Sequence, residues 1–558
     1  MPASKPVTRG NAFRSPLPTL ALLALLWLTV VGLAPALRLL AEATGPALPP
    51  LLQDGSIWRA AGRSLVVALG GALLATLIGA AQASLLLLRA MPGRGMLLFL
   101  CILPLLVPPQ ILALAFIQTG GPSSPLLISL GLAPPLGSGN PFHGPGGMIL
   151  LLGIQGAPLV LLAIAGLLRR LPAELLTAAR GLGATPAQAL RQVIWPLLLP
   201  GVLAGAGLAF VAALGNFGIA AMLGIPGRYT VLTVLIWQRL SATGPAALSQ
   251  VAALSLLLAA LALPGLLAQF LAARRGSGGR AGRPFVPLDP TPRARAALLL
   301  LAFYLAVVLL LPLASLLTSA IVPAMGMALT ADSATLRHFD AMLSPGAHTL
   351  GAFGNSLLLS GGAALILAVA ALPVALALHH RPVRWASTGA DLPYALPGAC
   401  TAVSVILLVL SLPGGGAAYG TMALILFAYL ARFQALALRP VAAAAARLDP
   451  ALEDAARGLG AGLWARLVWV HLPPLLPALT AGGILVVLLA VNEVTVSSLL
   501  HGPGTQTLGV LVFNLQDGGQ SPQAAAVSCL ALLTVGGLIG AATLLGRRLP
   551  PGTLPWRP

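Results

Sequence analysis

The chain has 558 residues, of which 58% are hydrophobic and only 8% are charged, and its mean hydropathy is +0.96. A soluble domain carries about 25% charged residues, so this composition excludes a soluble globular protein and indicates an integral membrane protein. The net charge is +19, but every basic residue except Lys5 is an arginine, and we expect the arginines to be scattered in short loops. No basic surface with interleaved aromatic residues is present, which argues against nucleic acid as a partner.

The first half predicts six transmembrane helices. A polar, basic N-terminal segment precedes an apolar run of about 24 residues that ends at Leu40 and has no A-x-A cleavage signal. This run is too long for the core of a signal peptide, so we predict a retained first helix. Windows of about 20 residues place the other five helices at 63–88, 96–117, 147–168, 197–221 and 247–272.

A stretch rich in Gly, Arg and Pro follows at 274–295 and is typical of a linker between domains. The second half then predicts six more helices, at 296–319, 355–378, 391–411, 418–438, 474–499 and 523–545. In lipid an open chain satisfies its backbone only as helix. We therefore expect an all-α membrane protein with about 12 transmembrane helices in two tandem six-helix domains, 1–273 and 296–558.

The arginines predict the orientation. If the N-terminus is cytoplasmic, the inner segments hold all basic residues, including Arg432 and Arg439, except for six on the outer side: Arg38, Arg59, Arg63, Arg228, Arg239 and Arg337. This bias is the one that the positive-inside rule describes, and it places both termini in the cytoplasm.

One segment occurs twice, at 171–200 and at 448–477, on two loops that this topology places in the cytoplasm. The string AARGLGA starts at Ala178 and again at Ala455, 277 residues later. At the same offset Gly183 matches Gly460 and Pro196 matches Pro473, which makes this an internal repeat. The halves also match at Arg63-Ser64 and Asn355-Ser356, each expected to open a long helix, and they predict a pseudo-twofold axis along the membrane normal.

Each repeat predicts two short helices that meet at a glycine. Gly183 and Gly460 lie where a helix should stop in the left-handed conformation that suits glycine. Thr185 followed by Pro186 is typical of an N-cap and first helical residue, whereas Gly462 starts the second copy less clearly. Apolar residues between the glycine and the returning proline are expected to be exposed and to dock a soluble partner: Leu190, Trp464 and Leu467.

Both copies satisfy the pattern A-A-x3-G-x9-(I/V)-x-x-P, with Val193 and Val470 before the two prolines. This pattern resembles the EAA loop of permease subunits in binding-protein-dependent ABC importers of the type I fold. The family's Glu is replaced by Thr177 and Asp454, while Glu174 and Glu453 lie out of register. The resemblance implies two type I domains whose ATPase-coupling residues are Ala178, Ala179, Gly183, Pro196, Ala455, Ala456, Gly460 and Pro473.

The chain has no nucleotide site of its own. A P-loop requires G-K-[ST], and the single lysine precedes any glycine-rich loop. We therefore expect a transport subunit rather than an enzyme, with no cofactor of its own and with ATP bound by a separate subunit. Two coupling loops in one chain predict two copies of that ATPase. The resemblance further implies an extracytoplasmic substrate-binding protein and a place in the bacterial inner (cytoplasmic) membrane.

The substrate is open at this stage. Fused chains of this length resemble permeases for ferric iron, thiamine and 2-aminoethylphosphonate or polyamine, and ferric iron is favoured by this resemblance. A secondary transporter, driven by an ion gradient, would also have twelve helices in two halves and stays the alternative class.

Three polar residues are candidates for the translocation path. Asn492 and Glu493 fall in the predicted eleventh helix, and Asn216 falls opposite, at the repeat offset, in the fifth. A charged residue within the membrane indicates function, although interhelical hydrogen bonding is an equal alternative. No metal site is predicted: His379 and His380 are a lone pair at a helix end, and the cysteines (Cys101, Cys400 and Cys529) are expected to be buried hydrophobic residues.

Overall fold

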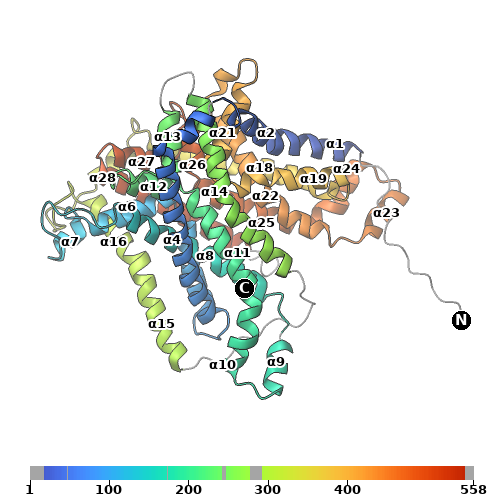
Figure 1. Cartoon of the computed structure of the whole chain (residues 1–558), viewed down its shortest axis with the longest axis horizontal. Coiled ribbons are helices and arrows are strands. Elements are labelled where there is room, and N and C mark those ends of the chain that lie inside the picture. Colours follow the sequence, from blue (N-terminus) through green and yellow to red (C-terminus); the bar gives the residue numbers. More distant parts are fainter. Residues whose placement is uncertain (1–17, 47, 173, 242–246, 277–291, 547–558) are drawn as a thin grey trace.

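The computed structural model describes residues 18–46, 48–172, 174–241, 247–276 and 292–546 (Figure 1). Most of the predicted linker at 274–295 and both terminal segments lie outside these residues. The regular secondary structure within them is helical, and the β-bridge that joins Gly420 to His501 lies outside any strand.

In its described residues the first half forms fourteen α-helices. The first membrane span consists of α1 (Pro18–Trp27), a π-helical turn (Leu28–Leu33) and α2 (Ala34–Ala43). The other helices follow in order: α3 (Leu48–Gln53), α4 (Gly55–Leu86), α5 (Arg94–Leu106), α6 (Pro109–Gly120), α7 (Pro125–Ser129), α8 (Pro145–Leu168), α9 (Glu174–Gly181), α10 (Pro186–Ala189), α11 (Trp195–Leu214), α12 (Phe217–Gly224), α13 (Leu232–Leu240) and α14 (Ala247–Gly276).

The second half repeats this order of helices. It begins with α15 (Pro292–Leu305), a π-helical turn (Ala306–Leu310) and α16 (Leu311–Ile321). The other helices are α17 (Arg337–Leu343), α18 (Thr349–Ala377), α19 (Arg381–Ala390), α20 (Leu392–Ala395), α21 (Gly398–Leu410), α22 (Met422–Ala445), α23 (Pro450–Gly458), α24 (Leu463–Ala465), α25 (Leu472–Val491), α26 (Thr495–Leu500), α27 (Leu508–Asp517) and α28 (Ser521–Gly546), with a 3-10 turn at Gly415–Ala418.

Eleven helices in the described part of the chain are long and apolar enough to cross a membrane. The number is twelve if Arg381–Ala395 and Gly398–Leu410, which meet at an angle of 116°, form one broken span. The expected all-α membrane fold with about 12 spans is therefore confirmed.

Four of the predicted helices are interrupted, and here the sequence prediction was wrong. The helix expected at 96–117 breaks at Val107-Pro108, and the one at 391–411 breaks at Leu396-Pro397. Proline has no N–H for the helix ladder and disfavours helical geometry in the residue before it, so both preceding residues are extended. The helices expected at 197–221 and 474–499 break at Asn216 and at 492–494.

The first span of each half crosses to the other half. α1 packs on α18 and α19, and α2 packs on α21, whereas α15 contacts α4 and α16 contacts α6. In Figure 1, α15 accordingly runs beside α4 and apart from α18 and α25. Neither half therefore completes its packing alone.

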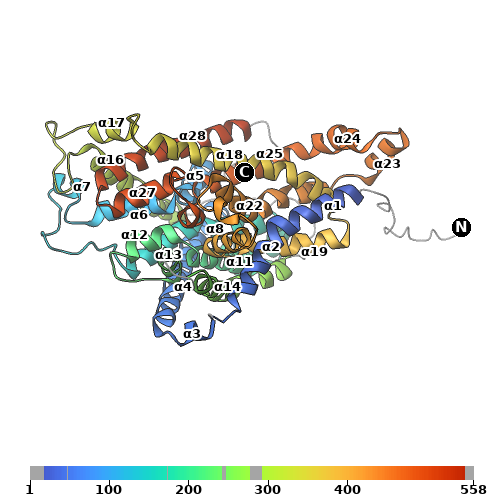
Figure 2. The same cartoon turned by 90° about the horizontal axis from the view of Figure 1, so that it is seen from above.

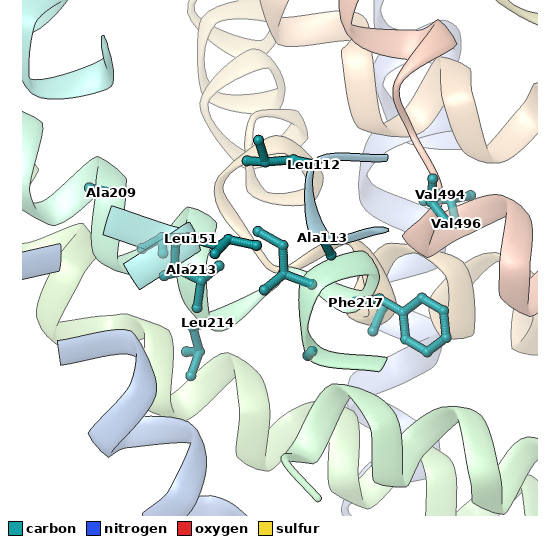
Figure 3. Packing of buried hydrophobic residues seen from close by; sticks show 14 of the residues in the cluster. Leu112, Ala113, Leu151, Ala209, Ala213, Leu214, Phe217, Val494 and Val496 are labelled. Atoms are coloured by element: carbon teal, nitrogen blue, oxygen red, sulfur yellow. The ribbon is translucent and has the colours of Figure 1, made fainter. Parts of the chain in front are cut away.

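The largest buried core contains residues of both halves. Figure 3 shows Leu112 and Phe217 of the first half in the same packed region as Val496 of the second. Nearby, the rings of Phe217, Trp237 and Phe513 pack against one another with centroids 5.6–5.8 Å apart. The two halves are thus joined by a continuous apolar interface at the centre of the molecule.

Candidate functional site

The first repeated segment folds into two short helices, α9 and α10, joined at Gly183, and we call residues 174–194 the first elbow. Gly183 has a φ of +87°, the left-handed conformation expected for it. Its turn is closed by hydrogen bonds from Leu182 N to Ala178 O and from Ala184 N to Ala179 O. Thr185 then caps α10 through a reciprocal pair of bonds with Gln188, so the predicted stop and start are both confirmed.

The second elbow, residues 450–471, has the same backbone. Gly460 has a φ of +77°, and the turn is closed by bonds from Leu459 N to Ala455 O and from Ala461 N to Ala456 O. Gly462 occupies the N-cap of α24 without a side-chain hydrogen bond, which is why its sequence was less clear as a helix start. In Figure 1 both elbows project from the bundle, α9–α10 at the bottom and α23–α24 at the right.

The exposed apolar residues of the elbows differ from those expected. Trp464 is exposed as predicted, but Leu190 and Leu467 are buried because they lie in the π-helical turns that pack back on α9 and α23. The exposed tips are instead Leu182 and Leu459, whose exposed fractions are 90% and 89%. A sequence signal for this pair existed, since each precedes the left-handed glycine of its repeat.

Each elbow continues directly into a membrane span. Pro196 and Pro473 are the second residues of α11 and α25, preceded by π-helical turns at Leu190–Ile194 and Arg466–His471. Continuous helices therefore run over Pro186–Leu214 and Leu463–Val491, and the separate return to the membrane expected at 197 and 474 was wrong.

A buried carboxylate holds the second elbow together. The side chain of Glu453, only 7% exposed, accepts hydrogen bonds from Arg457 at 2.9 Å and Arg466 at 2.6 Å, and pairs with His471 at 2.9 Å. In the first elbow the positions of Glu453, Arg466 and His471 are taken by three buried apolar residues: Leu176, Ala189 and Ile194. Asp454 and Thr177, which replace the family's Glu, are exposed.

At the centre of the first half, the break after α11 is closed by amide side chains. Asn216 caps α12 by accepting a bond from Ile219 N at 2.9 Å, and its Nδ2 donates to Gln155 Oε1 on α8 at 2.9 Å. Gln155 Nε2 in turn donates to Val107 O, the carbonyl at the break between α5 and α6, at 3.3 Å. One chain of hydrogen bonds thus connects two helix breaks.

In the second half, charged residues form the equivalent series of hydrogen bonds. Glu493 Oε1 accepts from Val496 N at 3.1 Å, and its Oε2 accepts from Arg432 Nε on α22 at 2.7 Å. Arg432 Nη1 reaches Leu396 O, the carbonyl at the break before α21, at 3.5 Å. Arg432 therefore lies inside a membrane span, and its expected place on an inner loop was wrong.

The breaks of the two halves meet one another. Asn492 Nδ2 donates to Leu106 O across the interface at 2.8 Å, and Gly215 lies so close to Pro397 that a Cβ there would be 3.1 Å from it. Thr495 Oγ1 adds a long contact of 3.5 Å to Gly215 O. Asn216, Asn492 and Glu493 thus lie at helix breaks rather than within helices, and Gln155 and Arg432 are the partners that sequence reasoning missed.

The matched pair Arg63-Ser64 and Asn355-Ser356 lies inside α4 and α18 and does not open either helix. Ser64 Oγ accepts a hydrogen bond from Leu232 N, and Ser356 Oγ accepts one from Leu508 N, at 2.8 and 2.9 Å. These serines satisfy the first backbone donors of α13 and α27, whose N-caps, Val231 and Thr507, make no such side-chain bond. The match between Ser64 and Ser356 therefore reflects a shared structural role, the capping of α13 and α27.

The remaining polar candidates form no site in the described residues. Cys101, Cys400 and Cys529 are buried free thiols, as predicted. The rings of His379 and His380 stack 3.9 Å apart after α18, and burial lowers the pKa of His379. No group of three or more His, Cys, Asp and Glu side chains that could hold a metal ion lies in the part of the chain that the structure describes.

Comparison with known proteins matches the chain to the family described as binding-protein-dependent transport system inner membrane component, over residues 71–276 and again over 363–552. A Sinorhizobium fredii protein named as a probable ABC transporter permease, y4fN, is 29% identical over 90% of this chain and 88% of its own length. The Salmonella typhimurium protein named for 2-aminoethylphosphonate transport, PhnV, is 31% identical over 43% of this chain and 89% of its own length. A solved bacterial ABC transporter that imports alginate covers 46% of this chain and 94% of its own chain, with 17% identity and a TM-score of 0.35.

Proposed function

The chain belongs to the family of binding-protein-dependent transport system inner membrane components, and we propose that its two elbows are the surfaces through which a separate ATPase drives transport. The observation that carries this proposal is the pair of exposed leucines, Leu182 and Leu459, on two elbows with the same backbone. An exposed large apolar residue on a small, rigid projection fits an apolar cleft on a soluble partner. The coupling residues expected from the sequence are part of this proposal: Ala178, Ala179, Gly183, Pro196, Ala455, Ala456, Gly460 and Pro473.

Two elbows in one polypeptide imply two ATPase copies for each chain, one on each of the domains proposed at 1–273 and 296–558. The predicted cytoplasmic side is then the side of the elbows. In Figure 2, α7 and α17 lie at the end of the molecule opposite to α23 and α24, and this end is the proposed docking face of the extracytoplasmic binding protein.

The central helix breaks are the proposed barrier in the translocation path. Asn216, Asn492 and Glu493 lie where both halves meet, and their hydrogen bonds hold the breaks together in this structure. Opening a path along the interface requires these bonds to exchange partners. The polar side chains then offer contacts to a passing solute in an otherwise apolar interface.

The identity of the transported substrate is also part of this proposal. Ferric iron, favoured from the sequence, stays a prediction, with thiamine and 2-aminoethylphosphonate or polyamine as its alternatives. Relatives named for 2-aminoethylphosphonate and for putrescine support the last of these, the latter being Escherichia coli PotI, which is 30% identical over 26% of this chain and 52% of its own length.

Affinity purification of the chain from its native membrane, with its partners identified and counted by mass spectrometry, tests the proposal. Two ATP-binding subunits per chain are expected, and any binding protein that co-purifies can be assayed for iron, thiamine, phosphonate and polyamine. Glycine replacement at the elbows, as Gly183→Trp and Gly460→Trp, should remove the ATPase without affecting membrane insertion. A chain that binds no ATPase and transports alone in response to an ion gradient would be a secondary transporter, and the proposal would be wrong.

A further inference from the structure

The central hydrogen-bond chain is neutral in one half and charged in the other. Gln155 and Arg432 occupy the same repeat position, 277 residues apart, as do Asn216 and Glu493. In both versions one side chain accepts a hydrogen bond from a backbone N–H in the first turn of a short helix, and its partner reaches the carbonyl at a helix break. The hydrogen-bonded arrangement at the helix breaks therefore requires two hydrogen-bonding side chains, but it does not require that they are charged.

Charges at this position are costly. The side chains of Arg432 and Glu493 are 21% and 8% exposed and lie at a helix break within the membrane-spanning bundle. Removing two ions from water costs more than removing two amides, and their attraction offsets only part of this cost. A neutral pair that makes the same contacts is available within the same chain, so the charges indicate a second role.

The charged pair also retains unused hydrogen-bonding groups. Arg432 binds through Nε and Nη1, and its Nη2 makes no hydrogen bond to any residue in the described part of the chain. Asn492, which precedes Glu493 in the chain, is 8% exposed and its Oδ1 has no partner among the described protein atoms. The ion pair and the residue next to it in the chain thus retain a donor that suits an anion and an acceptor that suits a cation.

We propose that Arg432, Glu493 and Asn492 form a transient binding site for a small zwitterion, a molecule that carries both an ammonium and an acidic oxyanion. An inorganic cation or a polyamine entering here would pair with Glu493 and leave Arg432 buried without a partner. A simple anion would do the reverse. A zwitterion replaces both partners at once, so it separates Arg432 from Glu493 without leaving either charge unpaired.

This inference names the substrate class of the proposed permease and therefore rests on that function. Its test uses the chain with its ATPase subunits in nanodiscs, held with a non-hydrolysable ATP analogue. Equilibrium dialysis measures binding of labelled 2-aminoethylphosphonate and of β-alanine, which distinguish a phosphonate from a carboxylate partner for Arg432. Ethylphosphonate and putrescine, which each lack one of the two charges, are the comparison probes.

The wild-type complex should bind at least one of the two zwitterions in a saturable manner, and about tenfold or more tightly than either comparison probe, each of which carries charge of only one sign. The double variant R432Q/E493N, which transplants the pair of the first half, should weaken zwitterion binding by a similar factor. The control D391N/R439Q removes an ion pair at another point of the same half and should bind as wild type does.

Equal binding of the zwitterions and of the comparison probes, ethylphosphonate and putrescine, by the wild-type complex would overturn the inference, and this arm needs no variant to fold. Undiminished zwitterion binding by folded R432Q/E493N would also overturn it. A complex that assembles and hydrolyses ATP but binds neither zwitterion refutes this inference alone. A chain that recruits no ATPase refutes the proposed function instead.

Discussion

The buried carboxylate of the second elbow allows a quantitative prediction. Glu453→Leu removes the acceptor shared by Arg466 and His471, whose side chains are themselves nearly buried, and neither Arg466 Nε nor His471 Nδ1 has another partner in the described structure. Breaking a buried ion pair by removing one partner costs about 3–5 kcal/mol. Since about 1.4 kcal/mol corresponds to a tenfold change in an equilibrium constant, the elbow should open roughly a hundredfold to a few thousandfold more often.

The first elbow supplies the matched rescue. The triple variant E453L/R466A/H471I reproduces its apolar trio of Leu176, Ala189 and Ile194, and it should restore stability because apolar replacement of a whole buried ion network is often neutral or stabilising. Hydrogen exchange of amides 450–471 in nanodiscs measures the opening, with Asp454→Leu, at the exposed neighbouring position, as control. Wild-type exchange in Glu453→Leu, or equally fast exchange in the single and triple variants, would refute the reasoning.

Three further predictions concern matched features of the repeat. Gly183→Ala places a Cβ in a left-handed residue with open space around it, so the elbow should lose about 1–2 kcal/mol from backbone strain alone, measured by exchange of amides 174–194, while insertion is unchanged. Leu182→Ala should weaken ATPase binding in a pull-down about tenfold or more, whereas Leu136→Ala, at an equally exposed leucine far along the chain, should not; equal losses would show that Leu182 has no special role. Ser64→Ala leaves the buried N–H of Leu232 without its acceptor and should lower the free energy of unfolding by about 1–3 kcal/mol, and an unchanged thermal midpoint would contradict this assignment.

The elbows were predictable from the sequence because their signals are local. A left-handed turn selects glycine, a helix start selects a capping threonine followed by proline, and the repeat shows each signal twice. Gly183, Gly460 and Thr185 therefore adopt the expected conformations. The burial of Leu190 and Leu467 could not be read in the same way, because a π-helical turn shifts the face that each residue presents.

The central breaks were not predictable from hydropathy. A window of about 20 residues averages over Val107-Pro108 or Gly215-Asn216 when both flanks are apolar. Arg432 fell within the helix predicted at 418–438 but was counted with the loop arginines by the positive-inside rule, and it lies in the middle of α22. The repeat offset could have identified Arg432, because Gln155 and Arg432 are separated by the same 277 residues as Asn216 and Glu493.

The charged versions of both matched features occur in the same half. The second elbow has Glu453 where the first has Leu176, and the second break has Glu493 where the first has Asn216. In each case the backbone geometry is the same without the charge, so the charge is not a requirement of the fold. A dimer of identical subunits would have to bury every such charge twice. Two unequal halves in one polypeptide bury each such charge only once. At the central helix breaks, a guanidinium and a carboxylate therefore lie in one half and neutral amides in the other, and one bound zwitterion can pair with both charges.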